Sequence, residues 1–229
     1  MKLLAFDTST ETMSIAVASE AQLWRHSGRG GALASSALIP AIQQLLHEAG
    51  LRLSDLDAIA FGRGPGSFTG LRTACAVAQG LAFGASVPVL GIDTLMAVAE
   101  QARERVGCTQ VLAVLDARMD QVYAGAYELV GGQWTRRGEF SLDKPEALDL
   151  PAGWTLAGNA FRAYGERLPR GPRHDALPDA SALLRLAPGM LAAGQGLPAD
   201  GALPLYIRDK VAQTTDERAA LRSLSTPLP

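Results

Sequence analysis

One pattern of strands and turns occurs twice in this chain, and it restricts the possible folds more than any other feature. Residues 3–7 (LLAFD) match residues 112–116 (LAVLD), so that an apolar run ends on an aspartate in both places. Each run is followed at a similar distance by a second strand-like run, and then by a third that carries Trp24 or Trp134. Short apolar runs separated by polar turns are typical of β-meanders. The repetition predicts two related domains.

Helices are expected to alternate with strands after the first meander. Apolar residues at helical spacing predict an amphipathic helix over 33–49, and Gly50 stands where a C-terminal glycine cap is expected. A second helix is expected over 67–84, directly after a buried strand. This order predicts an α/β fold with a mixed sheet. We expect an N-terminal domain over 1–106, and a reduced C-terminal domain with a polar tail over 107–229.

Composition narrows the class of protein. The 229 residues are 48% hydrophobic and 19% charged, as in globular proteins. The formal net charge is −2, so the chain as a whole is not expected to attract nucleic acid or an anionic membrane. The N-terminal segment becomes polar after six residues and predicts neither a signal peptide nor a membrane span. We therefore expect a cytoplasmic protein without a membrane partner.

A glycine-rich stretch, GRGPGSFTG over residues 62–70, precedes the second predicted helix. A P-loop requires a lysine after its last glycine, but Leu71 follows Gly70 here. A dinucleotide-binding loop requires a third glycine where this sequence has Ser67 or Thr69. Two interpretations remain, with Ser67 as the expected N-cap in both. Either free amides at the start of the helix bind an anion, or the glycines form a tight turn that permits close packing.

The helix over 67–84 carries small residues on two sides. Thr69, Thr73, Ala76 and Gly80 form one narrow face, and the opposite face is also small and apolar. A helix that only covers a sheet should be polar on the side that faces away from it. We therefore expect a second element to contact this helix. That element is either another helix of the same domain or another subunit.

Candidate catalytic and metal-binding groups are few. The three histidines are too widely separated to form an HxxxH or HExxH site, and no GxSxG motif provides a serine nucleophile. Cys75 and Cys108 match no metal or redox spacing. The densest polar group is Asp7, Thr8 and Ser9 at the end of the first strand. Such a turn can bind a phosphate or order Mg²⁺, or it can simply cap a hairpin through side chain to backbone hydrogen bonds.

Five segments of the chain together form a recognisable set. They are LLAFDTSTETMSIAVA, GRGPGSFTGLRTACAVAQGLA, GIDTLMAVA, LDARMDQVYAGAYE and PLYIRDKVA. With these segments the chain resembles the bacterial TsaB family, also called YeaZ. The resemblance implies the actin-like, sugar kinase and Hsp70-type ATPase (ASKHA) fold, with two related α/β domains whose mixed five-stranded sheets are flanked by helices. It also implies a role in making N6-threonylcarbamoyladenosine at position 37 of tRNAs that read ANN codons.

The resemblance further implies a protein that binds and activates the enzyme TsaD. TsaE would be a third component, the same surface would allow a homodimer, and contact with tRNA would be indirect. The docking surface would lie on the first two helices of the N-terminal domain, over 33–49 and 67–84. Its expected residues are Leu38, Ile42, Thr69, Arg72, Thr73, Ala76, Gly80 and Phe83.

The sequence departs from a catalytic subunit of this type at its nucleotide and metal positions. The helix over 33–49 lacks the HxxxH pair of TsaD, and Asp116 is not followed by the glycine of a second phosphate turn. Asp7, Thr8 and Ser9 would then retain a vestigial nucleotide-binding turn. We expect no catalytic residue, no metal and no cofactor required by this chain, with ATP or ADP at most at the interface with the partner. The alternatives are an independent ATPase or kinase of the same fold and, less favoured, a peptidase.

Overall fold

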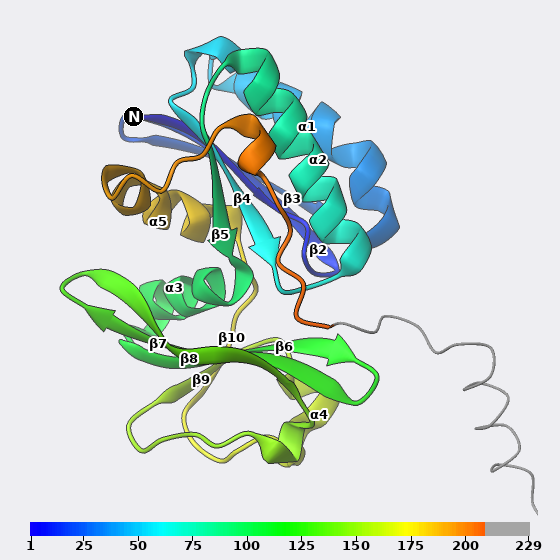
Figure 1. The fold of residues 1–229 in the computed structure, drawn as a ribbon, viewed down its shortest axis with the longest axis vertical. Coiled ribbons are helices and arrows are strands. Elements are labelled where there is room, and N and C mark those ends of the chain that lie inside the picture. The colour runs from blue at the N-terminus through cyan, green and yellow to red at the C-terminus, as the bar shows by residue number, and fades with distance from the viewer. Residues whose placement is uncertain (209–229) are drawn as a thin grey trace, which may run out of the picture.

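The computed structural model describes residues 1–208 of the chain, and it contains two α/β lobes (Figure 1). In the first lobe the strands follow the spatial order β3-β2-β1-β4-β5. The central strand β1 pairs antiparallel with β2 and parallel with β4, which makes the sheet mixed. The bounds of the strands are β1 (Lys2–Asp7), β2 (Thr12–Ser19), β3 (Gln22–Arg29), β4 (Ala58–Gly64) and β5 (Val89–Asp93).

The second sheet repeats the first. Its spatial order is β10-β9-β6-β7-β8, so that in both lobes the first strand in sequence is central, flanked by the second and fourth. The predicted pair of related α/β domains with mixed five-stranded sheets is therefore confirmed. The bounds are β6 (Gln110–Arg118), β7 (Gln121–Val130), β8 (Gln133–Asp143), β9 (Thr155–Gly158) and β10 (Arg173–Asp175).

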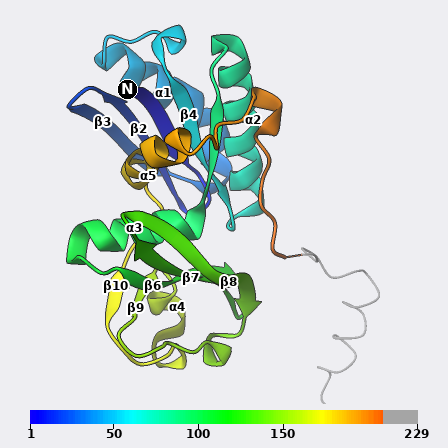
Figure 2. The same cartoon turned by 60° about the vertical axis from the view of Figure 1, so that its left-hand side comes forward.

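Helices cover both faces of the first sheet (Figures 1 and 2). On one face lie α1 (Ala34–Glu48) and α2 (Phe68–Ala85), and on the other lies α5 (Ala180–Ala192). The period of two along β1 explains this layering, because successive side chains of a strand point to opposite faces. Leu4 and Phe6 pack in the cluster under α1 and α2, while Leu3 and Ala5 pack under α5.

The ends of the two predicted helices agree only in part with the sequence analysis. α1 ends at the expected place, because Gly50 adopts φ +65 and its amide donates to the carbonyl of His47 over 3.0 Å. Ser67 occupies the expected N-cap position of α2, but its hydroxyl makes no capping hydrogen bond. The start of α2 is held instead by hydrogen bonds with Thr8 and Ser9 in the turn after β1.

The helix α3 (Thr94–Val106) lies between the two sheets (Figure 1). Ala97 belongs to the apolar cluster of the first sheet, whereas Leu95 and Val98 belong to that of the second. The second lobe also contains the short helix α4 (Phe161–Tyr164). In the described part of the chain, no helix combines the length and apolar character needed to cross a membrane.

The expected extent of the C-terminal domain, 107–229, is wrong for its later part. Ala180, Leu183 and Leu184 of α5 are buried against the first sheet. Beyond α5 the chain remains with the first lobe, where Leu197 and Val89 of β5 exchange backbone hydrogen bonds of 2.8 and 2.9 Å. The reason is that the face of the first sheet opposite α1 and α2 needs an apolar cover, which α5 supplies. The expected polar tail falls largely on residues 209–229, outside the described residues.

Candidate functional site

One face of α2 is exposed along its whole length. Phe83 is 82% exposed, and a Cβ atom added at Gly80 would meet no other atom within 4 Å in the described structure. α1 lies beside α2 but leaves this face uncovered, so a neighbouring helix of the same domain does not explain its small residues. The face consists of the exposed Thr69, Arg72, Ala76, Gly80 and Phe83 with the half-buried Thr73, and we call it the α2 face.

Two residues expected on the docking surface lie in the core instead. Leu38 and Ile42 are 0% and 1% exposed, and they pack with strand residues of the first sheet. The apolar stripe of α1 is thus used to cover the sheet. Exposed apolar side chains come instead from Leu33, the residue before α1, and from Ile39 of α1, both of which the sequence analysis missed as surface residues. Ile39 lies outside the apolar stripe of the predicted helix, which is the signal that could have indicated it.

An apolar groove of about 290 Å³ runs between α1 and α2. Ile39 and Leu46 line it from α1, and Leu81 lines it from α2. The two helices therefore present a surface of small and apolar residues.

At the N-terminal end of the α2 face, an arginine contacts two aromatic side chains that also contact each other. The Arg72 guanidinium lies 3.8 Å from the centroid of the Phe68 ring, and the Phe68 and Tyr206 centroids are 5.5 Å apart. Arg72 Nε also donates to the Tyr206 hydroxyl over 3.0 Å. Sequence reasoning missed Phe68 and Tyr206, and no local signal connects Tyr206 to a helix 134 positions earlier. We call these three residues the Phe68–Arg72–Tyr206 cluster.

The glycine-rich loop interlocks with the turn after β1. Thr8 Oγ1 donates to the Gly70 carbonyl over 2.7 Å, and the Ser67 amide donates to the Ser9 carbonyl over 2.7 Å. A Cβ atom at Gly70 would lie only 1.9 Å from the Thr8 carbonyl oxygen. The loop and the turn could not approach so closely if this residue had a side chain. The contacts therefore favour the second interpretation of the glycines, a tight turn that permits close packing.

Asp7 is buried between the glycine-rich loop and the turn after β1. It is 0% exposed, and its Oδ1 accepts hydrogen bonds from the Ser9 amide and hydroxyl at 2.8 and 2.6 Å. Its Oδ2 has no hydrogen-bond partner among the described residues. A Cβ atom added at Gly62 would lie only 1.7 Å from this oxygen, so the carboxylate fits because residue 62 is a glycine. Burial raises the pKa of Asp7 to about 6, although the Ser9 hydrogen bonds act in the opposite direction. Asp7 and Thr8 thus form a packed turn with little access for a phosphate.

A cavity of about 370 Å³ lies between the two lobes, beside this turn. Ser9 lines it from the first lobe, and Asp116 and Asn159 line it from the second. The Asp116 carboxylate accepts hydrogen bonds from the Tyr164 hydroxyl at 2.9 Å and the Arg118 amide at 2.8 Å. This aspartate is therefore already engaged by its own lobe. The described residues contain no group of three or more His, Cys, Asp or Glu side chains placed to bind a metal ion.

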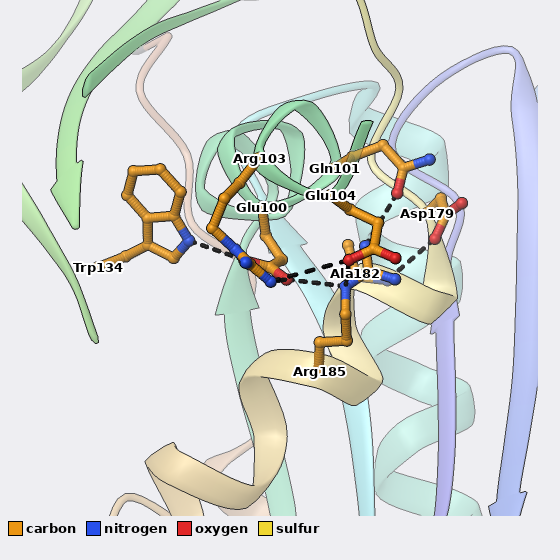
Figure 3. Close-up of polar contacts among 8 residues, drawn as sticks. All are labelled: Glu100, Gln101, Arg103, Glu104, Trp134, Asp179, Ala182 and Arg185. Atoms are coloured by element: carbon orange, nitrogen blue, oxygen red, sulfur yellow. Dashed lines mark hydrogen bonds and ion pairs between the residues drawn. The ribbon is translucent and has the colours of Figure 1, made fainter. Parts of the chain in front are cut away.

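A buried carboxylate joins the lobes on another side of the molecule (Figure 3). Glu100 of α3 is 3% exposed, and it accepts hydrogen bonds from Trp134 Nε1 at 3.0 Å, Arg103 Nε at 2.8 Å and Arg185 Nε at 2.7 Å. Burial by itself would raise the pKa of Glu100, but these three donors outweigh it and lower the pKa below its ordinary value. Since α3, β8 and α5 all contribute, we call these four residues the Glu100 joint.

Comparison with known sequences gives one dominant similarity. Residues 32–213 match the family model described as TsaD: tRNA N6-adenosine threonylcarbamoyltransferase. The tRNA threonylcarbamoyladenosine biosynthesis protein TsaB of Escherichia coli is 35% identical over 223 residues, which cover 93% of this chain and 96% of that protein. The protein of the same name from Haemophilus influenzae is 44% identical over 123 residues, 54% of this chain and 52% of its own.

Solved structures and a second group of relatives agree with this similarity. The structure of YeaZ from Pseudomonas aeruginosa has a TM-score of 0.84 and 44% identity, and the match covers 90% of this chain and 99% of that one. A tRNA N6-adenosine threonylcarbamoyltransferase of Syntrophus aciditrophicus is 41% identical over 81 residues, 32% of this chain and 24% of that protein. The structural match, together with the repeated sheet topology, confirms the predicted ASKHA fold class.

Proposed function

This chain belongs to the TsaB (YeaZ) family, and from this premise we propose that it binds and activates TsaD in threonylcarbamoyladenosine modification of tRNA. In this proposal the chain supplies a docking surface and no catalytic residue. TsaD carries out the transfer, TsaE is the third component, and tRNA contacts this chain only indirectly. Its relatives are named as tRNA threonylcarbamoyladenosine biosynthesis proteins, which supports a role in that pathway.

The observation that carries the proposal is the α2 face. Thr69, Thr73, Ala76 and Gly80 have short side chains or none, so another helix can approach α2 closely. Phe83 adds a large apolar side chain that is 82% exposed and can enter a pocket on a partner. An exposed apolar surface of this kind is typical of a protein-binding site.

The similarity to TsaD supports the identity of the partner. Because the family model for TsaD matches residues 32–213, the two proteins share much of their fold. Related folds can pair through corresponding helices about an approximate two-fold axis, as identical subunits do about an exact one. The same geometry would allow two copies of this chain to pair through the α2 face when TsaD is absent.

The cavity between the lobes supports a non-catalytic role. Asp116 is engaged by Tyr164 and Arg118, and Asp7 is buried under Gly62. Neither carboxylate is therefore free to hold a metal-bound phosphate. We place any ATP or ADP of the complex at the boundary with TsaD.

A substitution at Gly80 tests the docking surface. Gly80→Arg places a long charged side chain in open space on the α2 face, so the isolated chain should fold normally. We expect affinity for TsaD, measured by isothermal titration calorimetry, to fall by about 100-fold or more. Gly189→Arg is the matched control, since Gly189 is also a helical glycine with open space around it, but lies on α5.

Modification of tRNA in vitro with purified TsaD and TsaE provides the functional readout. We expect product when the wild-type chain or Gly189→Arg is added, and little or none with Gly80→Arg or without the chain. Wild-type affinity and product with Gly80→Arg would show that the assigned surface is wrong. Product formed equally well without the chain would refute its role as an activator.

A further inference from the structure

The segment after α5 returns along α2 toward the second lobe (Figure 1). Gln79 Nε2 donates to the Ala202 carbonyl over 3.0 Å, and Ala202 itself is buried in the core of the first lobe. The Leu205 amide then donates to the Arg63 carbonyl at the end of β4 over 2.7 Å. These contacts fix the path of residues 202–208, which we call the strap.

The glycine-rich loop is shaped to let the strap cross it. Gly64 adopts φ +125, a conformation that residues with side chains rarely adopt. A Cβ atom at Gly64 would lie 2.4 Å from the Leu205 carbonyl oxygen. The crossing point is thus determined by a glycine of the loop. Directly after it, Tyr206 reaches the α2 face and forms the Phe68–Arg72–Tyr206 cluster.

The far end of the strap holds a turn of the second lobe. Arg208 donates to the Gln121 Oε1 at 2.8 Å and to the Arg118 carbonyl at 3.4 Å, and it lies 3.3 Å from the Met119 sulfur. Arg118, Met119 and Asp120 all have positive φ values, of 60°, 54° and 62°. Arg118 and Met119 are residue types that rarely adopt this conformation, so contacts with other parts of the chain help to hold the turn: Arg208 from the strap, and Arg167, which pairs with Asp120.

The strap and the Glu100 joint connect the lobes at different places. The joint links α3, α5 and β8, whereas the strap links α2 to the turn between β6 and β7. In Figure 1 the strap descends on the side of α2, and α3 and α5 lie on the other side of the first sheet. The strap also lines the cavity between the lobes through Leu205 and Arg208. The two lobes are therefore connected on both sides of the cavity, by the Glu100 joint and by the strap.

We propose that the strap couples occupancy of the α2 face to the cavity between the lobes. A protein that contacts the Phe68–Arg72–Tyr206 cluster restrains Tyr206, and through it Arg208 and the turn at 118–121. That turn carries Arg118 and borders Asp116, so its position shapes the second-lobe wall of the cavity. The inference rests on the proposed function for the identity of the docking protein, TsaD. It adds that docking is transmitted to the other lobe.

Amide hydrogen exchange, read by mass spectrometry on the peptide that contains residues 118–121, tests this proposal in two steps. In the isolated chain, Arg208→Ala removes the contacts at the far end of the strap and should speed exchange in this peptide by about tenfold. Gln121→Ala removes one acceptor of Arg208 and should act in the same direction. Arg170→Ala is the control, because Arg170 is exposed and makes no hydrogen bond or ion pair among the described residues. Thermal melts verify that each variant is folded.

The second step adds saturating TsaD. We expect exchange at 118–121 to slow in the wild-type chain and in Arg170→Ala, but not in Arg208→Ala, which should still bind TsaD within about threefold of wild type. Slowing that persists in Arg208→Ala would mean that TsaD covers the turn directly, and would overturn the coupling. TsaD that binds the wild-type chain without slowing exchange would overturn it too, while leaving the proposed function intact. Failure of TsaD to bind the wild-type chain would refute both.

Discussion

Trp134 donates its indole N–H to Glu100 over 3.0 Å, and this bond connects a strand of the second lobe to the helix between the lobes. The carboxylate that receives it is buried and also accepts from Arg103 and Arg185. A buried charge with all of its partners in place is stable, but the loss of one member leaves the others unpaired. The Glu100 joint therefore adds a buried polar contact to the apolar packing by which α3 joins the two lobes.

Glu100→Gln should destabilise the chain by about 3 kcal/mol, because it leaves the two arginines without their shared carboxylate. Urea unfolding at neutral pH measures the loss. Glu139→Gln is the control, since the Glu139 side chain is 92% exposed and its removal should change the free energy of unfolding by less than about 0.5 kcal/mol. The lowered pKa of Glu100 fixes the pH dependence: its contribution is present at neutral pH and is lost as pH falls through that lowered pKa. Equal stabilities of the two variants would contradict this role.

Asp7 should make the chain more stable in mild acid than at neutral pH. Burial raises its pKa from 3.8 to about 6, so the folded state holds a proton that the unfolded state releases. The stabilisation is complete below the unfolded pKa and is lost as pH rises through about 6. Asp7→Asn removes this titration. From about pH 4 to about pH 7.5, the free energy of unfolding of wild type should fall by about 2 kcal/mol relative to the variant. Parallel pH profiles would rule out the shift.

Two glycines of the same helix should respond in opposite ways to alanine. Gly70→Ala forces a Cβ atom to within 1.9 Å of the Thr8 carbonyl and should cost about 2 kcal/mol or more. Gly80→Ala meets open space and should stabilise the chain by about 0.7 kcal/mol, because alanine favours the helix. Thermal and urea unfolding of the pair provide the comparison. A loss of stability at Gly80 as large as that at Gly70 would show that the α2 face is covered in the isolated chain.

Titration of ATP with Mg²⁺ into the isolated chain should give no binding tighter than about 1 mM and no release of phosphate. The physical reason is that Asp7 is buried and Asp116 is engaged within its own lobe. Calorimetry and a phosphate-release assay measure the two quantities. Tight binding accompanied by turnover would restore the alternative of an independent ATPase or kinase.

The sequence was informative where the period of a helix or a strand decides which residues are exposed and which are buried. The exposure of Thr69, Ala76 and Gly80 follows from a period of 3.6 residues, which separates them from the buried Leu71 and Ala78. The duplicated meander likewise predicted the second sheet. Leu38 and Ile42 were expected on the docking surface because of the resemblance, although both lie on the apolar stripe of the predicted helix, and their burial shows that this stripe covers the sheet.

Contacts between distant parts of the chain could not be predicted in this way. The Glu100 joint connects residues that are 34 and 85 positions apart, and no local pattern pairs them. α5 was assigned to the wrong lobe for the same reason, since its apolar face fits any exposed sheet. Tyr206 is brought to Phe68 and Arg72 by the path of the strap, which depends on the finished fold.

The return of α5 to the first sheet has a consequence for biosynthesis. During translation β1 to β5 emerge early, but the cover for Leu3 and Ala5 is encoded at 180–192. Until then this apolar face has no α5 to pack against, and at about 5–20 residues per second the interval lasts several seconds. A nascent chain of this kind is a natural client for chaperones, and premature termination before α5 should yield an aggregating product rather than a functional half.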